Sequence, residues 1–384
     1  MTSLSKGKIP PLLPNRRTQN EYGRETSFVY GDQSFGRIYK NPGSEDSIHG
    51  VWGNTAKKIR ESLEVLKIDK AELSRMSVLD IGTGRQAIRF QQLGARKVTH
   101  FDISRAHILQ TQRYCEENGI SNITSIHGDL TKDKLPEKEF DLIFASGIYQ
   151  HIQPPHLGLV NFAQSLKVGG RMYMGFYRSG DWRWFITALI REALPRRNFA
   201  KIKAKVALYF ALGDPEHFQV LRMLDDFYVP AISLCHPRDI QADMEACGFE
   251  KYYLEDDFRE YCHDSSSHLS IGADRIYVVK KKSLPYDALL SQDYRTARSI
   301  DQLRDIDYRD ELILENIDRW LELVDLYQHG FIDEDFWLDV LINLYRFARP
   351  WNEAQDFYFL QAREKGRHIL LAEFLRRIRS SIHA

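Results

Sequence analysis

Apolar residues follow two alternating patterns over the middle of the chain. Short runs rich in Val, Ile and Phe are typical of buried strands, and longer segments with apolar residues at helical spacing separate them. The predicted strands span residues 77–81, 97–102, 122–127, 140–146 and 171–177, and the predicted helices span residues 55–66, 85–93, 104–118 and 156–167. Because strands and helices alternate, we expect a parallel, doubly wound α/β sheet that binds its ligands at the carboxyl ends of the strands.

The pattern differs on both sides of this core. Residues 1–54 begin with an arm rich in Pro, Lys and Arg, and residues 181–226 interrupt the alternation with helical segments. Apolar stripes at helical spacing return in residues 284–384, where Gly330 and Pro350 mark helix ends. We therefore predict an N-terminal segment (1–54), an α/β domain (55–283) with a helical insertion at about 181–226, and an all-helical C-terminal domain (284–384).

A glycine-rich turn follows the first predicted strand, in the sequence V-L-D-I-G-T-G-R-Q-A at residues 78–87. Gly82 and Gly84 can adopt a positive φ and, because they lack Cβ, let a ligand approach the backbone closely. A turn of this kind between a strand and a helix indicates a site for a nucleotide cofactor.

Two cofactors fit this turn. Gly82, Gly84 and Ala87 satisfy the G-x-G-x-x-G/A pattern of dinucleotide-binding proteins, and Asp102 falls close to the distance expected for a ribose-binding acid. Asp80 separates the alternatives, because a carboxylate there would repel the phosphates of a dinucleotide but attract the ammonium and sulfonium charges of S-adenosylmethionine. S-adenosylmethionine is therefore favoured over NAD, and an NAD-dependent oxidoreductase is disfavoured.

The sequence D-I-G-T-G at residues 80–84 resembles motif I of the class I S-adenosylmethionine-dependent methyltransferases. Four later segments resemble the next motifs of that family in the same order: K-V-T-H-F-D (97–102), I-H-G-D-L (126–130), F-D-L-I-F-A-S-G-I-Y-Q-H-I (140–152) and L-K-V-G-G-R-M-Y-M-G-F-Y (166–177). The resemblance covers residues 76–180 and departs from the family at Gln86, where a third glycine is common. It implies a seven-stranded Rossmann-like methyltransferase sheet, completed by an antiparallel pair at residues 249–255 and 275–281.

The resemblance also implies a cofactor and a set of residues that bind it. The cofactor would be S-adenosyl-L-methionine, and the product would be S-adenosyl-L-homocysteine. Asp102 would hold the ribose hydroxyls, and Asp129 would contact the adenine amino group. The predicted cofactor-binding residues are Asp80, Gly82, Gly84, Asp102, Ile103, Asp129, Leu130 and Ser146.

Further residues are candidates for contact with the acceptor. In this family the segment before motif I commonly forms a lid, so we expect residues 1–54 to include a lid near His49 and Trp52. His151 follows the fourth motif, and neutral imidazole is a suitable general base near pH 7; a packed, hydrogen-bonded histidine is the competing interpretation. The candidate substrate-binding residues are Trp52, Tyr149, Tyr228 and His236.

Composition narrows the remaining function classes. The 384 residues contain 53 Lys plus Arg and 53 Asp plus Glu, so the formal charge of zero provides no overall attraction to nucleic acid or to an anionic membrane. The four cysteines lie far apart without a C-x-x-C pair, so we expect neither a metal site nor a disulfide framework. No apolar run has the length of a signal peptide or a membrane span, which predicts a cytoplasmic location.

These observations predict a methyltransferase that acts on a nitrogen or oxygen atom of a small-molecule acceptor, such as a natural-product or metabolite intermediate. The segment S-G-I-Y at residues 146–149 lacks the N-P-P-Y-like signature of enzymes that methylate nucleic-acid bases. The alternatives are a protein or tRNA methyltransferase, in which basic residues at 196–205 would join the C-terminal arginines, and a non-catalytic scaffold. The C-terminal helices carry no catalytic motif and are expected to cap the substrate or to form a homodimer.

Overall fold

The computed structural model describes residues 51–179, 182–193, 199–209, 223–224, 226–229, 231–254, 273–295, 298–299, 323, 326–327 and 329–348. The predicted N-terminal arm, His49 and the C-terminal arginines lie outside the described residues. No helix in these ranges is long and apolar enough to cross a membrane.

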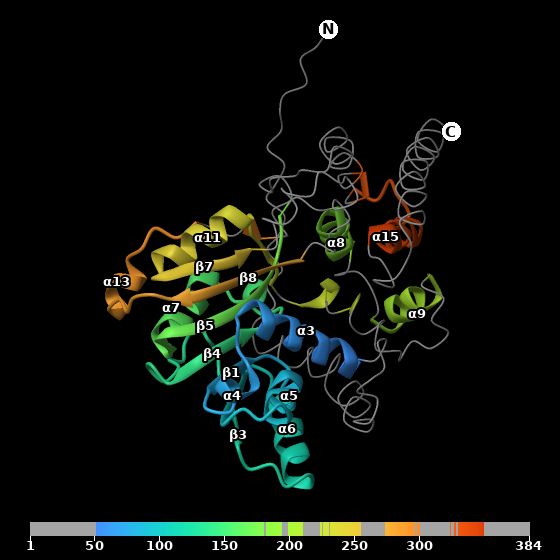
Figure 1. The fold of residues 1–384 in the computed structure, drawn as a ribbon. Coiled ribbons are helices and arrows are strands. Elements are labelled where there is room, and N and C mark those ends of the chain that lie inside the picture. The colour runs from blue at the N-terminus through green and yellow to red at the C-terminus, as the bar shows by residue number, and fades with distance from the viewer. Residues whose placement is uncertain are drawn as a thin grey trace.

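A seven-stranded sheet forms the centre of the described structure (Figure 1). Its strands lie in the order β3 (Ile123–His127), β2 (Lys97–Asp102), β1 (Ser77–Ile81), β4 (Phe140–Ala145), β5 (Leu166–Tyr177), β8 (Ala273–Lys280) and β7 (Phe249–Leu254). The first five are parallel, and β8 runs antiparallel to both of its neighbours. The doubly wound sheet and its antiparallel pair are thus confirmed. The strand order reverses between β1 and β4, and such a reversal creates the ligand crevice in sheets of this kind.

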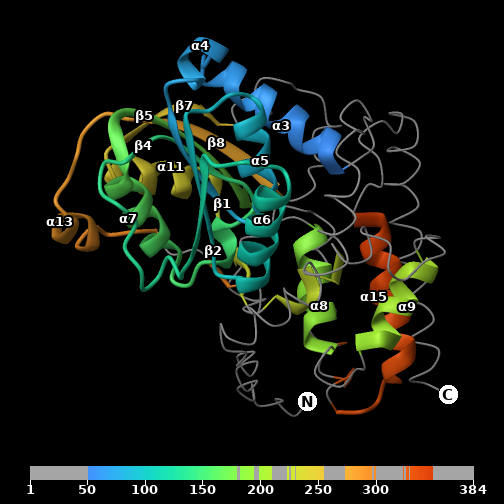
Figure 2. The ribbon, with the colours of Figure 1, turned by 90° about the horizontal axis from the view of Figure 1, so that it is seen from below.

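Helices cover both faces of this sheet (Figure 2). One face carries α3 (Val51–Val65), α4 (Lys70–Leu73), α5 (Arg85–Gln92) and α6 (Arg105–Glu117), and the other carries α7 (Pro155–Ser165), α11 (Pro237–Ala246) and α13 (Tyr286–Leu290). A short 3₁₀ turn, η2 (Tyr149–His151), follows β4 and precedes α7.

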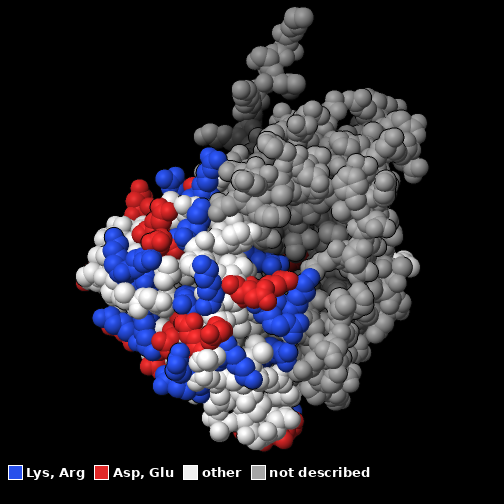
Figure 3. All heavy atoms as spheres, in the orientation of Figure 1, with Lys and Arg blue, Asp and Glu red and all other residues white. Residues whose placement is uncertain are grey.

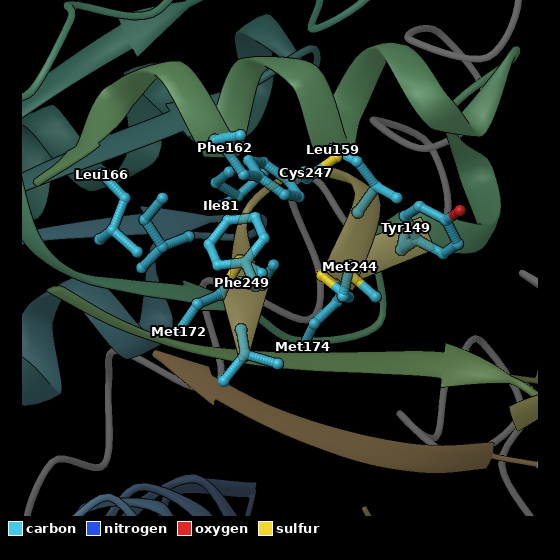
Figure 4. Packing of buried hydrophobic residues seen from close by; sticks show 14 of the residues in the cluster. Ile81, Tyr149, Leu159, Phe162, Leu166, Met172, Met174, Met244, Cys247 and Phe249 are labelled. Atoms are coloured by element: carbon cyan, nitrogen blue, oxygen red, sulfur yellow. The ribbon is translucent and has the colours of Figure 1, made fainter. Parts of the chain in front are cut away.

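Successive residues of β1 supply two separate cores, as strand geometry requires. Val78 packs in the cluster beneath α3 and α5, whereas Leu79 packs in the larger cluster beneath α7 and α11. Figure 4 shows this larger cluster, in which Leu159 and Phe162 of α7 point toward the methionines of β5. Because both faces of the central strands are buried, apolar residues dominate these strands, and the polar residues among them, such as Asp80 and His100, are buried too.

The start of β5 differs from the prediction. The helix expected to reach residue 167 ends at Ser165, and the strand begins at Leu166 rather than at residue 171. Leu166 already pairs with Phe140, after which the register between β4 and β5 shifts. Gly169 has a φ of 81°. The glycine pair therefore forms an irregularity within the strand, and not the turn that precedes it.

The first described helix also begins earlier than predicted. α3 starts at Val51 instead of residue 55, so that Trp52, which we expected in a lid, belongs to the first turn of this helix. The side chain of Trp52 lies outside the described residues. A lid formed by the segment before it stays a prediction.

The insertion contains two described helices, α8 (Trp182–Ala193) and α9 (Phe199–Tyr209), and both contact α15 (Glu334–Ala348) near the C-terminus (Figure 2). Ion pairs among the described residues join α9 to α15: Lys201 pairs with Asp335, and Lys205 pairs with Asp339 and, at 3.9 Å, with Asp335. Trp337 of α15 is fully buried. Lys201 and Lys205 of the insertion therefore face acidic partners on α15.

Another part of the predicted C-terminal domain packs on the sheet domain. α13 contacts α7, and Leu289 belongs to the core beneath α7 and α11. A two-residue strand, β9 (Arg298–Ser299), pairs with β6 (Ser233–Leu234). The domain boundary predicted at 283 stays a prediction, but the residues immediately after it are in contact with the core.

Candidate functional site

The glycine turn joins β1 to α5 at the reversal of strand order. Gly82 has a φ of 133° and Gly84 a φ of 80°, so both adopt the left-handed backbone that glycine tolerates. A Cβ on Gly84 would lie 2.1 Å from Thr111 Oγ1, whereas a Cβ on Gly82 would come no nearer than 3.4 Å to another side chain, that of Ile148. Gly84 is therefore required by packing, and Gly82 is required by its backbone conformation.

Asp80 lies directly beneath this turn and is fully buried. Its Oδ2 atom accepts a hydrogen bond from the backbone N–H of Ala87 at 2.9 Å, and its Oδ1 atom has no hydrogen-bond partner among the described residues. Burial raises the pKa of the Asp80 carboxyl to about 7, and the hydrogen bond from Ala87 opposes this rise. A buried oxygen of this kind suits a positively charged hydrogen-bond donor from a ligand.

Asp102 ends β2 beside the turn. Its Oδ1 atom accepts from the backbone N–H of Ser104 at 2.5 Å, and its Oδ2 atom lies 3.2 Å from Nδ1 of His107. Both side chains are buried. Each carboxylate oxygen has two lone pairs, so the existing bonds leave acceptor capacity for a ribose hydroxyl. Sequence reasoning missed His107, although it falls on the first turns of a predicted helix that follows the acid.

Asp129 follows β3, and its carboxylate is engaged by its own loop. Oδ1 accepts from the backbone N–H and the hydroxyl of Thr131, at 2.9 and 2.7 Å, and Oδ2 pairs with Lys132 Nζ at 3.1 Å. Burial would raise the pKa of Asp129, but the bonds from Thr131 and Lys132 outweigh burial and lower it. The predicted adenine contact stays a prediction.

The two hydrophobic residues of the predicted cofactor-binding set have contacts within the protein. Leu130 belongs to the core, and the carbonyl of Ile103 lies 3.0 Å from His127 Nε2.

Ser146 follows the end of β4, on the other side of β1. Its hydroxyl accepts a hydrogen bond from Lys58 Nζ of α3 at 3.1 Å. This contact brings the first described helix to the carboxyl edge of the sheet. Sequence reasoning missed Lys58, because nothing in the sequence indicates that a helical lysine pairs with a residue 88 positions later.

His151 has both ring nitrogens in hydrogen bonds. Nδ1 donates to the carbonyl of Ala231 at 2.8 Å, so Nε2 is the acceptor, and the side-chain amide of Gln150 donates to it at 3.1 Å. Burial lowers the pKa of His151 to about 4, which leaves the ring neutral at neutral pH. In this arrangement Gln150 occupies the lone pair that a general base would use. The role of His151 as a base stays a prediction, and it requires Gln150 to move.

The other described substrate-binding candidates, Tyr149, Tyr228 and His236, have separate surroundings within the protein. Tyr149 is 1% exposed and lies at the end of the large core cluster (Figure 4). Tyr228 is also buried, and His236 caps the N-terminus of α11, where its Nδ1 accepts from the backbone N–H of Arg238 at 3.1 Å. Among the described residues, the structure does bring Asp80, the glycine turn, Asp102 and Ser146 together at the carboxyl ends of β1, β2 and β4.

The carboxyl ends of β1, β2 and β4 form the candidate cofactor site, and comparison with protein families identifies the class of domain that carries it. Residues 78–170 match the family model described as a methyltransferase domain. Together with the observed strand order, this match shows that the chain contains a methyltransferase domain with a Rossmann-like fold. Methyltransferase domains of this kind use S-adenosylmethionine as methyl donor. Comparison with curated proteins finds no match.

Several solved structures, methyltransferases among them, are similar to parts of the chain. The YcgJ protein from Bacillus subtilis is 16% identical, with 58% of this chain and 100% of that protein covered and a TM-score of 0.36. An S-adenosylmethionine-dependent methyltransferase from Mesorhizobium loti is 15% identical, covering 54% and 92% of the two chains with a TM-score of 0.37. A putative methyltransferase from Haloferax volcanii, solved in complex with the Trm112 methyltransferase activator, is 12% identical. The match covers 65% of this chain and 99% of that protein, with a TM-score of 0.37.

Proposed function

We propose that this protein transfers a methyl group from S-adenosyl-L-methionine to a nitrogen or oxygen atom of a small-molecule acceptor. One observation carries the proposal: Asp80 Oδ1 is buried beneath the glycine turn without a hydrogen-bond partner among the described residues. A carboxylate oxygen in that position suits the ammonium group of the cofactor and would repel the phosphates of a dinucleotide.

The residues at the carboxyl edge fit the groups of this cofactor. Asp80 and the backbone of Gly82 and Gly84 would hold its amino-acid part, Asp102 its ribose and Asp129 its adenine. When bound, the cofactor supplies a methyl group on a positively charged sulfur. Because the sulfur departs as a neutral thioether, the protein has no leaving-group anion to stabilise. Its main tasks are to align the acceptor, to accept any proton that the acceptor loses and to exclude water.

The surroundings of His151 support an acceptor site beyond Ser146. The ring of Tyr177 lies edge-on to His151, with 5.7 Å between the ring centroids, and stacks on Trp184 of the insertion at 3.9 Å. Trp184 is fully buried, so it supports the Tyr177 ring from behind. We propose that the insertion contributes to acceptor specificity by positioning Tyr177, because an aromatic ring suits an apolar or cationic acceptor. His151 would act as general base once Gln150 turns away from its Nε2 atom.

Charge supports a small acceptor over nucleic acid. In the described part of the basic run, Lys201 and Lys205 are paired with aspartates of α15. On the face drawn in Figure 3, basic and acidic side chains are interspersed over the described residues. Nucleic-acid binding relies on a continuous basic surface. Pairing with aspartates removes part of the basic surface that a tRNA methyltransferase would need.

The proposal includes a cytoplasmic location and a homodimer formed through the C-terminal helices.

Calorimetric titration with S-adenosylhomocysteine tests the proposed cofactor. We expect micromolar binding by the wild type. In Asp102→Ala the affinity should fall by about tenfold or more, which is the scale of a lost buried hydrogen bond to a charged group. Asp141→Ala is the matched control, because Asp141 lies near the amino end of β4, where it accepts from the backbone N–H of Ser77. NAD should not bind.

The outcomes separate the functional alternatives. Binding that Asp102→Ala weakens and Asp141→Ala preserves would justify a screen of small-molecule acceptors. Methylation of protein or tRNA fractions, with no activity on small molecules, would favour the macromolecular alternative. If the folded wild type does not bind S-adenosylhomocysteine, the chain is a scaffold that keeps the fold without the activity.

A further inference from the structure

His100 of β2 lies beneath the glycine turn and is fully buried. Its Nε2 atom is 2.6 Å from the carbonyl oxygen of Gly82, and its Nδ1 atom is 3.3 Å from Ser125 Oγ on β3. A carbonyl can only accept, so Nε2 carries the proton and donates to Gly82, while Nδ1 accepts from the serine hydroxyl. Burial lowers the pKa of His100 to about 4, so this neutral tautomer persists at neutral pH.

Strand β2 thereby holds Gly82 by both of its backbone polar groups. The N–H of Gly82 donates to the carbonyl of Phe101 at 3.1 Å, and its C=O accepts from the His100 ring. With φ at 133°, Gly82 has a backbone conformation that no regular strand or helix enforces. Two fixed hydrogen bonds therefore define the direction of the peptide plane at the first glycine.

The same imidazole also supports the second glycine. A Cβ built on Gly84 would lie 3.0 Å from His100 Cε1 and 2.1 Å from Thr111 Oγ1 of α6. The ring and the threonine thus occupy the space beside the Cα of Gly84, and a side chain at this position would overlap them.

We propose that His100 is a positioning residue for the cofactor: it holds the glycine turn in its ligand-binding conformation through the hydrogen bond to the Gly82 carbonyl. This inference rests on the proposed function. His100 is not among the predicted cofactor-binding residues. Its role in binding would depend on one donor atom, Nε2. His100 itself is buried beneath the backbone, so it acts through the turn and does not touch the ligand.

A set of matched variants isolates this donor. The amide of His100→Gln can place a nitrogen close to the position of Nε2, whereas the shorter amide of His100→Asn cannot reach Gly82, and His100→Leu has no donor. Val278→Ala is the control for lost stability, because Val278 is fully buried in β8, away from the turn in the strand order. For each variant, thermal unfolding, calorimetric binding of S-adenosylhomocysteine and amide hydrogen exchange of residues 82–88 are measured.

We expect His100→Leu and His100→Asn to weaken binding at least tenfold and to speed exchange in residues 82–88. His100→Gln should bind within about threefold of the wild type, and Val278→Ala should lose thermal stability without losing affinity. Wild-type affinity in His100→Leu or His100→Asn overturns the inference, as does a His100→Gln variant as weak as His100→Asn. If the wild type does not bind, the proposed function fails, and the exchange data alone decide whether His100 holds the turn.

Discussion

The Oδ2 atom of Asp80 accepts a hydrogen bond from the backbone N–H of Ala87 at 2.9 Å, which ties the end of β1 to the first turn of α5. The two carboxylate oxygens therefore have different surroundings. One satisfies a helix N–H that has no partner within the helix, and the other is buried without a partner among the described residues. A single side chain thus stabilises the local fold and presents a negative charge beneath the cofactor turn.

Asp80→Asn should stabilise the ligand-free protein and weaken cofactor binding. Because the pKa of Asp80 is raised to about 7 in the folded state, its burial costs stability progressively as pH rises from about 4 to 7. The amide carries no charge, so we expect the free energy of unfolding at pH 8 to increase by about 1–2 kcal/mol, with little change at pH 4. Affinity for S-adenosylhomocysteine should fall about tenfold or more. Denaturant unfolding at both pH values and calorimetry check this trade-off; a variant that is less stable at pH 8 would contradict it.

Gly84→Ala should abolish the site by steric overlap. The new Cβ would lie 2.1 Å from Thr111 Oγ1 and would also require a φ of 80°, so we expect a loss of about 3 kcal/mol or more in unfolding free energy. Gly94→Ala is the control, since Gly94 has a φ of 95° but nothing within 4 Å of the added atom. It should cost about 1 kcal/mol, the backbone effect alone. Similar losses in the two variants would mean that packing beneath the turn is looser than the structure indicates.

His151→Asn tests the proposed general base while keeping a donor toward the Ala231 carbonyl. If Nε2 removes a proton from the acceptor, turnover should fall about a hundredfold or more, with affinity for S-adenosylhomocysteine unchanged. Gln150→Ala should retain turnover, because it frees the lone pair that the amide occupies. Since burial lowers the pKa of His151 to about 4, the wild-type rate should lose this base only as pH falls through about 4. A loss below threefold in His151→Asn would assign the residue to holding the Ala231 segment.

The pairs between α9 and α15 should contribute little stability one at a time. Lys205 and Asp339 are partly exposed, and a double-mutant cycle with Lys205→Ala and Asp339→Ala should give a coupling of about 0.5–1 kcal/mol that weakens in high salt. Trp337→Ala should cost about 3–5 kcal/mol, because this side chain is fully buried. Denaturant unfolding measures both. A larger effect from the ion pair than from Trp337 would show that charge, rather than packing, attaches α15.

Much of the fold could be predicted from local pattern. The strands from β1 to β4 begin where predicted or within one residue. β1, β2 and β4 are largely buried and rich in apolar residues, whereas β3 is a partly exposed edge strand in which apolar and polar residues mix. β5 was mispredicted at its start, since Gly169 and Gly170 usually mark a turn and only the pairing of Leu166 with Phe140 shows that the strand has already begun. The acids of the site were found for a related reason: each lies at or just beyond the carboxyl end of a recognisable strand.

The sequence by itself determined the class of sheet, the glycine turn and the acids at its edge, because strand period, backbone freedom and the order of motifs depend on neighbouring residues. Only the tertiary structure showed which partners those residues have. His100 reaches the Gly82 carbonyl across 18 positions, Lys58 reaches Ser146 across 88, and Gln150 occupies the Nε2 atom of His151. Hydrogen bonds of this kind depend on distances set by the packing of strands and helices, and those distances arise only when the chain has folded.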